Sequence, residues 1–241
     1  MSMYAITKKP APLYNTYDFP YHKQQLETDY QGLLKEVEVV VFPNTKFTIQ
    51  RHLPNNVSEV TTNDYPSRTP LYIDSRFLKP ILEETPEREK KLPPPEVILN
   101  FMQSALGTRY FWGGNWIQGI PEMASFYPQF PFSDDLICKG CDCSGLLYQA
   151  TGGYTPRNTS DLLNYGQDLG LDPRDAASAQ KIVKPLDMIV WKGHVIFVLD
   201  SEHIIESVLG PGVIISDFIE RYAFFQDRNF SVRRWHPNFL T

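Results

Sequence analysis

The side chain best suited to covalent chemistry in this chain is a cysteine at the start of a predicted helix. Three cysteines, Cys138, Cys141 and Cys143, lie in the hexapeptide CKGCDC. Cys143 opens the run CSGLLYQA, which predicts a helix that stops at Gly152-Gly153. The first turn of a helix offers unpaired N–H groups and the positive end of its dipole, and both lower the pKa of a thiol. Asp142 opposes this effect, although its carboxylate can cap the helix. Cys143 is therefore the candidate nucleophile.

A nucleophilic thiol also needs a base, and a histidine paired with an acid can supply it. Among the five histidines, His194 opens the strand-like run HVIFVL, and HIIESV follows it after Asp200-Ser201-Glu202. If those three residues form a hairpin loop, Ile196 faces Glu206, so Glu206 is the diagonal neighbour of His194 on the same face. His203 falls on the opposite face. We expect Glu206 to fix the tautomer of His194, as the acid of a Cys-His-acid triad does.

Plainer interpretations of these residues stay open. The spacing of the three cysteines also occurs in zinc sites, but neither a fourth ligand nor a second clustered pair is visible. Cys143 could be a small buried apolar residue, and His194 an ordinary core histidine. Trp112 and Trp116 favour packing over catalysis, and Gly113-Gly114 lacks the spacing and the lysine of a phosphate-binding loop. We expect no metal and no cofactor.

The elements that must position these side chains begin with a β-rich N-terminal part. Short β-branched stretches punctuated by Pro, Asn and Asp predict a small barrel or sandwich. They are VEVVVF (37–42), KFTIQRHL (46–53), VSEVTT (57–62) and PLYIDSRFL (70–78). The charged, proline-rich stretch EETPEREKKLPPP then predicts a linker. We expect a β domain at 1–82, a linker at 83–95 and a second domain at 96–241.

The second predicted domain begins with helices and ends with strands. PEVILNFMQSALGT places Val97, Ile98, Phe101, Met102 and Ala105 at helical spacing. The predicted helix at Cys143 follows a loop rich in glycine and aromatic residues. The strand-like runs MIVW, HVIFVLD, HIIESV and GVIIS come after it. Helices first and strands afterwards predict an α+β fold.

Composition restricts the classes of function. The chain has 241 residues, a formal net charge of −5, 42% hydrophobic and 13% aromatic residues, which predicts one or two folded domains. The mild acidic excess disfavours nucleic acid and anionic membranes as partners. No apolar run is long enough to cross a bilayer, and the first residues lack the pattern of a secretory signal. We therefore expect a cytoplasmic protein with reduced thiols.

Several strings, taken in order, resemble the NlpC/P60 family of papain-like cysteine peptidases. That family typically reads G-x-Y-x-W-G-G, D-C-S-G, P-R-x-x-S, G-D-hydrophobic, and H-V-G-I-Y followed by a third polar residue. The resemblance covers about residues 95 to 241. The matching strings are GTRYFWGGN (107–115), DCSGL (142–146), PRNTSDLLNYG (156–166), PLDMIVWKGHVIFVL (185–199) and IIESV (204–208).

The resemblance implies a papain-like catalytic domain after an SH3-like β domain, with a role for each matching residue. In the catalytic triad, Cys143 is the nucleophile, His194 the base and Glu206 the third member. Tyr110 then brings its hydroxyl near the nucleophile, where it helps to bind the oxyanion. The implied pocket for the amino end and the carboxylate of the substrate contains Asp142, Ser144 and Ser160.

The substrate implied by the resemblance is a small peptide derived from peptidoglycan. The bond cleaved is the one between γ-D-glutamate and meso-diaminopimelate in short stem peptides, which in the cytoplasm serves cell-wall recycling. The sequence departs from the family pattern at Leu186, where a glycine is usual, at Ile196-Phe197-Val198, and at Glu206, where a histidine is frequent. These departures leave open a non-catalytic binding module of the same fold. A cysteine amidase acting on another amide is a further alternative, and the oligomeric state is left open.

Overall fold

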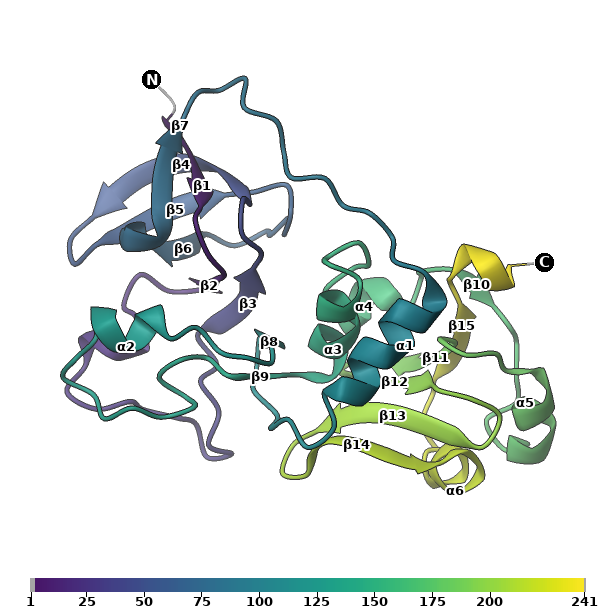
Figure 1. The fold of residues 1–241 in the computed structure, drawn as a ribbon. Coiled ribbons are helices and arrows are strands. Elements are labelled where there is room, and N and C mark those ends of the chain that lie inside the picture. The colour runs from purple at the N-terminus through teal and green to yellow at the C-terminus, as the bar shows by residue number, and fades with distance from the viewer. Residues whose placement is uncertain (1–2, 241) are drawn as a thin grey trace. The chain divides into compact units, whose positions relative to one another are not determined.

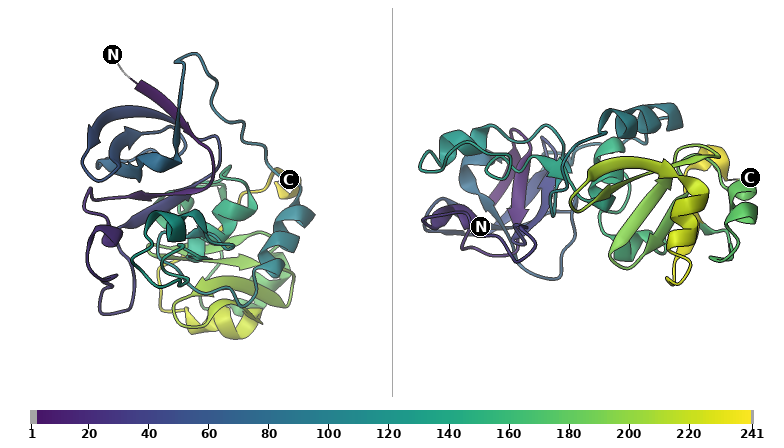
Figure 2. Two further views of the ribbon diagram at one scale, coloured as in Figure 1. Left: turned by 60° about the vertical axis from the view of Figure 1, so that its left-hand side comes forward. Right: turned by 90° about the horizontal axis from the view of Figure 1, so that it is seen from below.

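Two large antiparallel sheets, each in a unit of its own, and one two-stranded sheet are present in residues 3–240, which the computed structural model describes (Figures 1 and 2). The first unit contains the residues up to Lys90 together with Phe111–Cys141. The second contains Lys91–Tyr110 and the residues from Asp142 onward. The predicted mixture of helices and sheets is confirmed.

The first unit is built on a seven-stranded sheet of order β3-β2-β6-β5-β4-β1-β7. Its interior is aromatic and aliphatic, with Tyr14, Phe19, Tyr21, Phe47 and Ile73 fully buried. The four stretches expected to form strands supply β3 to β6, and three further strands complete the sheet. The strands are β1 (Met3–Thr7), β2 (Ala11–Tyr14), β3 (Val37–Val41), β4 (Lys46–Leu53), β5 (Val57–Thr61), β6 (Leu71–Asp74) and β7 (Leu78–Ile81), with short 3-10 helices at Pro20–His22 and Ser75–Phe77.

Residues 111–141 belong to the first unit because they dock on its edge strand β3. The side-chain amide of Asn115 accepts a hydrogen bond from Val40 N (2.9 Å) and donates one to Val40 O (2.7 Å). Gly113 has a φ of 69°, and a Cβ there would lie 2.2 Å from the carbonyl oxygen of Val37. The predicted boundaries put this segment in the domain at 96–241, whereas these contacts group it with β3. Its elements are β8 (Asn115–Trp116), α2 (Glu122–Phe126) and β9 (Gly140–Cys141).

The second unit contains a six-stranded sheet of order β10-β15-β11-β12-β13-β14 with helices packed against it (Figure 1). Both predicted helices are confirmed, at α1 (Pro95–Ser104) and α3 (Cys143–Ala150). The other elements are α4 (Thr159–Leu162), β10 (Gln167–Asp168), α5 (Ala176–Ile182), β11 (Met188–Trp191), β12 (His194–Val198), β13 (His203–Val208), β14 (Gly212–Asp217), α6 (Phe218–Phe224), β15 (Ser231–Arg234) and a 3-10 helix at Pro237–Phe239.

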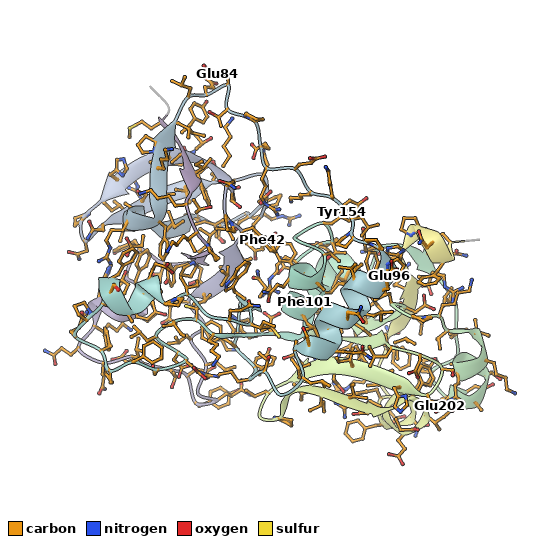
Figure 3. All side chains as sticks on the ribbon, viewed as in Figure 1. Phe42, Glu84, Glu96, Phe101, Tyr154 and Glu202 are labelled. Atoms are coloured by element: carbon orange, nitrogen blue, oxygen red, sulfur yellow. The ribbon has the colours of Figure 1, made fainter. Side chains whose placement is uncertain are left out.

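Helix α1 is amphipathic, with one buried apolar face and one exposed face. Ile98 and Met102 are fully buried, and Glu96 in the first turn is exposed (Figure 3). Val97, which shares the apolar pattern, is exposed instead, because the buried stripe is narrower than the run of apolar residues. None of the helices within residues 3–240 has the length and apolarity needed to span a bilayer.

The hairpin of β12 and β13 positions the candidate base and acid. Phe197 faces Ile205 and Val198 faces Ile204, which confirms the register expected for a loop at 200–202. On one face of these strands, Ile196, Val198 and Ile204 pack with residues of α5 and α6, including Ala179, Phe218 and Tyr222. Because side chains alternate along a strand, the same face carries His194 and Glu206.

Candidate active site

Cys143 is the first residue of α3, as the sequence predicts. Asp142 caps this helix, and its carboxylate accepts a hydrogen bond from Gly145 N at 2.7 Å. The sulfur of Cys143 lies 3.9 Å from the carbonyl oxygen of Gly193. Main-chain N–H groups of Val195 and Ser144 also hydrogen-bond to the sulfur. The nucleophile candidate therefore contacts the backbone on both sides of His194.

The thiol of Cys143 is held in its protonated form at neutral pH. Burial raises its pKa to about 12, and the charge of Asp142 acts in the same direction. Arg157 and the N–H groups of Val195 and Ser144 lower the pKa, but by less. The expectation that the helix start gives this thiol a low pKa is therefore wrong, since burial outweighs the N-terminal donors.

His194 and Glu206 form the hydrogen-bonded pair that strand alternation predicts. His194 Nε2 lies 2.6 Å from a carboxylate oxygen of Glu206, whose side chain is fully buried. The imidazole also lies beside two aromatic rings, with its centroid 5.0 Å from that of Trp191 and 6.5 Å from that of Phe225. His203 is exposed and contacts Asp200 instead.

Arg221 of α6 is a further member of this cluster. Its Nε donates to the second carboxylate oxygen of Glu206 at 2.5 Å. Burial raises the pKa of Glu206, but the hydrogen bonds and charges of His194 and Arg221 lower it more, so the net shift is downward. The buried carboxylate of Glu206 is therefore ionised, and it contacts His194 of β12 and Arg221 of α6.

Asp142 and Ser144 lie together in a network centred on Arg157. The guanidinium donates to both carboxylate oxygens of Asp142, at 2.9 and 2.6 Å, and to the Ser144 hydroxyl at 2.8 Å. Both side chains of the ion pair are almost fully buried. The negative charge beside Cys143 is thus paired inside the protein.

The other residues implied by the resemblance are located as follows. Tyr110 is half-buried at the end of the segment that follows α1. Gly212, with a φ of 77°, allows this segment to approach β14, since a Cβ there would lie 2.2 Å from the Thr108 carbonyl oxygen. Ser160 is exposed in α4. The roles of Tyr110 and Ser160 stay predictions.

Two arginines were missed by reasoning from the sequence. Arg157 lies in the string PRNTS, whose match to the P-R-x-x-S pattern was a signal for it. Arg221 has no such signal, because α6 lies outside every matched string. Arg221 contacts Glu206 only in the folded structure, where α6 packs on the face of the sheet that carries Glu206.

Leu186 takes a backbone conformation that glycine adopts more easily. Its φ is 70°, its side chain is buried, and its carbonyl oxygen accepts a hydrogen bond from Trp235 Nε1 at 2.8 Å. Leu186 therefore combines a left-handed backbone with a buried side chain.

The cysteines do not form a metal site within residues 3–240, where no group of three or more His, Cys, Asp or Glu side chains is arranged to hold an ion. Cys138, Cys141 and Cys143 are buried, and none of the three is in a disulfide. Cys138 has its sulfur 3.3 Å from the Tyr21 hydroxyl, and burial raises its pKa to about 12. These contacts are those of a packing residue.

Comparisons with known proteins give structural similarity only. No family model matches the chain, and no curated protein matches it. NlpC2 from Trichomonas vaginalis is 17% identical, with 98% of this chain and 73% of that chain covered and a TM-score of 0.38. An NlpC/P60 family protein from Bacillus cereus is 16% identical, with 98% and 64% covered and a TM-score of 0.41. RipD from Mycobacterium tuberculosis, a non-catalytic NlpC/p60 domain protein adapted to peptidoglycan binding, is 21% identical, with 51% and 86% covered and a TM-score of 0.36.

Proposed function

We propose that this protein is a cysteine peptidase of the NlpC/P60 type that hydrolyses the bond between γ-D-glutamate and diaminopimelate in short peptidoglycan peptides. The observation that carries the proposal is the 2.6 Å hydrogen bond between His194 and Glu206, on the strand whose first residues contact the sulfur of Cys143. The order of the matching strings supports the substrate class. In the cytoplasm, where its thiols stay reduced, the activity would serve recycling of cell-wall fragments.

The reaction begins with a protonated thiol. Glu206 holds His194 through Nε2, so Nδ1 is the nitrogen that takes the proton of Cys143. The sulfur attacks the D-glutamyl carbonyl carbon, and the imidazolium protonates the leaving amine of diaminopimelate. Water, activated by the same imidazole, then hydrolyses the thioester and releases the γ-D-glutamyl product. In this mechanism His194 acts as a general base, since burial raises the pKa of the Cys143 thiol.

Further residues have proposed roles around this reaction. Tyr110 offers a hydroxyl to the oxyanion. Ser144 and Ser160 offer hydroxyls to the polar ends of the peptide. Asp142 holds Arg157, and this pair fixes the start of α3 and thereby the position of Cys143.

The direct test is incubation with L-Ala-γ-D-Glu-diaminopimelate and detection of free diaminopimelate by mass spectrometry. The wild type should release it, and Cys143→Ala should not. Cys141→Ala, which removes a thiol from the same hexapeptide, serves as the matched control and should retain activity. Absence of release by a folded wild type, or equal release by Cys143→Ala, contradicts the proposal.

A second candidate function is peptide binding without hydrolysis. The observation that favours it is the environment of the Cys143 sulfur, which is buried, hydrogen-bonded to main chain and raised in pKa to about 12. A binding module would take up the same tripeptide in isothermal titration calorimetry and leave it intact after prolonged incubation.

A further inference from the structure

The turn between β11 and β12 leads into two backbone groups that contact the sulfur of Cys143. The carbonyl oxygen of Gly193 lies 3.9 Å from the sulfur, and the N–H of Val195 donates a hydrogen bond to it. His194, the candidate base, lies between these two residues in the sequence. The position of this turn relative to α3 therefore decides how the candidate nucleophile and the candidate base lie relative to each other.

Side-chain packing does not hold the turn at Gly193. Gly193 is exposed and has a φ of 99°. Apart from its chain neighbours, no heavy atom of the described residues lies within 4 Å of the position that a Cβ would take there. Exposed turns with few packing contacts open easily. A contact from outside the hairpin is therefore needed to fix Gly193 against Cys143.

Thr159, the first residue of α4, supplies such a contact. Its hydroxyl oxygen accepts a hydrogen bond from Gly193 N at 3.0 Å. Helix α4 also packs beside β11. Water could accept the same hydrogen bond because Gly193 is exposed, so this N–H does not need a protein partner. The consequence of the contact is that it ties the turn to α4.

The segment 157–159 also holds the other side of the candidate site. Arg157 donates to both carboxylate oxygens of Asp142, at 2.9 and 2.6 Å, and Asp142 caps α3, which begins at Cys143. Thr159 follows Arg157 by two residues. The segment therefore contacts the start of α3 at one end and the turn between β11 and β12 at the other.

We propose that Thr159 is a positioning residue, which fixes the turn between β11 and β12 relative to α3 and so keeps the sulfur of Cys143 in contact with Gly193 and Val195. The catalytic consequence of this inference rests on the proposed function, whereas the contacts do not depend on a substrate. Thr159 acts through the backbone of Gly193. A displacement of about 1 Å between reacting groups can reduce a rate by about 100-fold, so loss of the contact should lower kcat more than it raises KM.

The first test measures amide exchange with water by NMR in isotope-labelled protein. Thr159→Val replaces the hydroxyl by a methyl group of similar size and removes the acceptor. The Gly193 amide should then exchange about tenfold faster, the change that loss of one hydrogen bond implies. The Val195 amide, which donates to the sulfur, should also exchange several-fold faster, because the turn is then free to move away from α3.

Further variants complete this test. Thr159→Ser keeps the acceptor, so both amides should exchange as in the wild type. Thr159→Ala removes the acceptor without adding a methyl group and should match Thr159→Val, and it replaces that variant if the valine is poorly folded. Thr108→Val, at a half-buried threonine in the segment after α1, is the matched control. The amide of Val198, which donates to Asp187 O at 2.9 Å, reports whether each variant is folded.

Either of two results of the exchange experiment would overturn the proposal. If Gly193 exchanges at the wild-type rate in both Thr159→Val and Thr159→Ala, the hydrogen bond does not hold the turn. If Gly193 exchanges faster but Val195 does not, the contact is local and does not position the groups around Cys143.

Activity separates this inference from the proposed function. If the wild type cleaves the tripeptide, Thr159→Val should lower kcat by about tenfold with little change in KM, and Thr159→Ser should retain the wild-type kcat. A wild-type kcat in folded Thr159→Val overturns the inference while the proposed function stands. If the wild type does not cleave the tripeptide but the amides of Gly193 and Val195 exchange faster in Thr159→Val, the proposed function fails while the positioning role of Thr159 stands.

Discussion

His194 Nε2 lies 2.6 Å from a carboxylate oxygen of Glu206, and the two residues come from neighbouring strands of one hairpin. The register of β12 and β13 produces this contact, since Phe197 faces Ile205 and the two side chains fall on one face. A slip of one residue would move Glu206 to the other face. The length of the loop at 200–202 therefore controls the pairing of acid and base.

Acid stability should depend on Glu206. Its pKa is lowered in the folded protein, so the unfolded state binds more protons as the pH falls. The stabilisation is complete above the ordinary glutamate pKa of about 4.3 and is lost as the pH falls through the folded value. Urea denaturation between about pH 3 and 6 should show a steeper loss for the wild type than for Glu206→Gln. Glu202→Gln, at an exposed glutamate in the hairpin loop (Figure 3), should follow the wild type. Parallel curves for the wild type and Glu206→Gln would contradict this prediction.

Alkylation of Cys143 should report its raised pKa. Because the thiol pKa is about 12, the thiolate fraction should increase about tenfold for each pH unit between about pH 7 and 9. Iodoacetamide labelling of the folded protein, followed by peptide mass spectrometry, should therefore rise across this interval without a plateau. Cys138, which is fully buried, provides the comparison within the same sample and should label more slowly. A plateau in Cys143 labelling below about pH 8 would show a thiolate that the structure does not support.

The ion pair of Asp142 and Arg157 should stabilise the second unit. Asp142→Asn keeps an acceptor for Gly145 N but removes the charge opposite a guanidinium that is 4% exposed. Breaking a buried pair in this way costs about 3 kcal/mol in the free energy of unfolding. Asp168→Asn breaks the more exposed pair with Arg233 and should cost about 0.5 kcal/mol. Equal decreases in the free energy of unfolding of the two variants, measured by urea denaturation, would show that the buried pair stabilises the protein no more than the exposed one.

At Leu186 a glycine variant should be more stable than an alanine variant, the reverse of the usual order of stability. Both substitutions remove the same buried side chain, but at a φ of 70° a Cβ is strained and glycine is not. Leu186→Gly should therefore be more stable than Leu186→Ala by about 1 kcal/mol. At Leu199, a buried leucine without a positive φ, alanine should be the more stable replacement. The same order of stability at both positions would argue against the strained backbone.

Local patterns predicted the elements of this protein better than the partners of its charged side chains. Alternation and turn residues predicted the hairpin at 194–206, and helix capping predicted the start of α3, because both depend on neighbours in sequence. The pKa of Cys143 was predicted in the wrong direction, since burial is set by tertiary packing. Arg221 was missed because its contact with Glu206 requires α6 to fold back over the sheet.

The segment at 111–141 was harder to place for the same reason. It begins with a run rich in glycine and aromatic residues, and no local pattern reveals that the side-chain amide of Asn115 pairs with a strand far earlier in the chain. The contact between Asn115 and Val40 spans 75 positions. Such pairings between a side chain and a distant backbone have no periodic signature.

The contact between Asn115 and Val40 also covers part of an exposed edge of the first sheet. Strand β3 ends the strand order of this sheet, and its sequence, VEVVV, is the kind of apolar edge on which a second chain could add a strand. The Asn115 amide occupies both the N–H and the carbonyl of Val40, and Gly113 lets the loop backbone lie close beside Val37. The loop therefore covers hydrogen-bonding groups of this edge strand that a strand from a second chain would otherwise need for pairing.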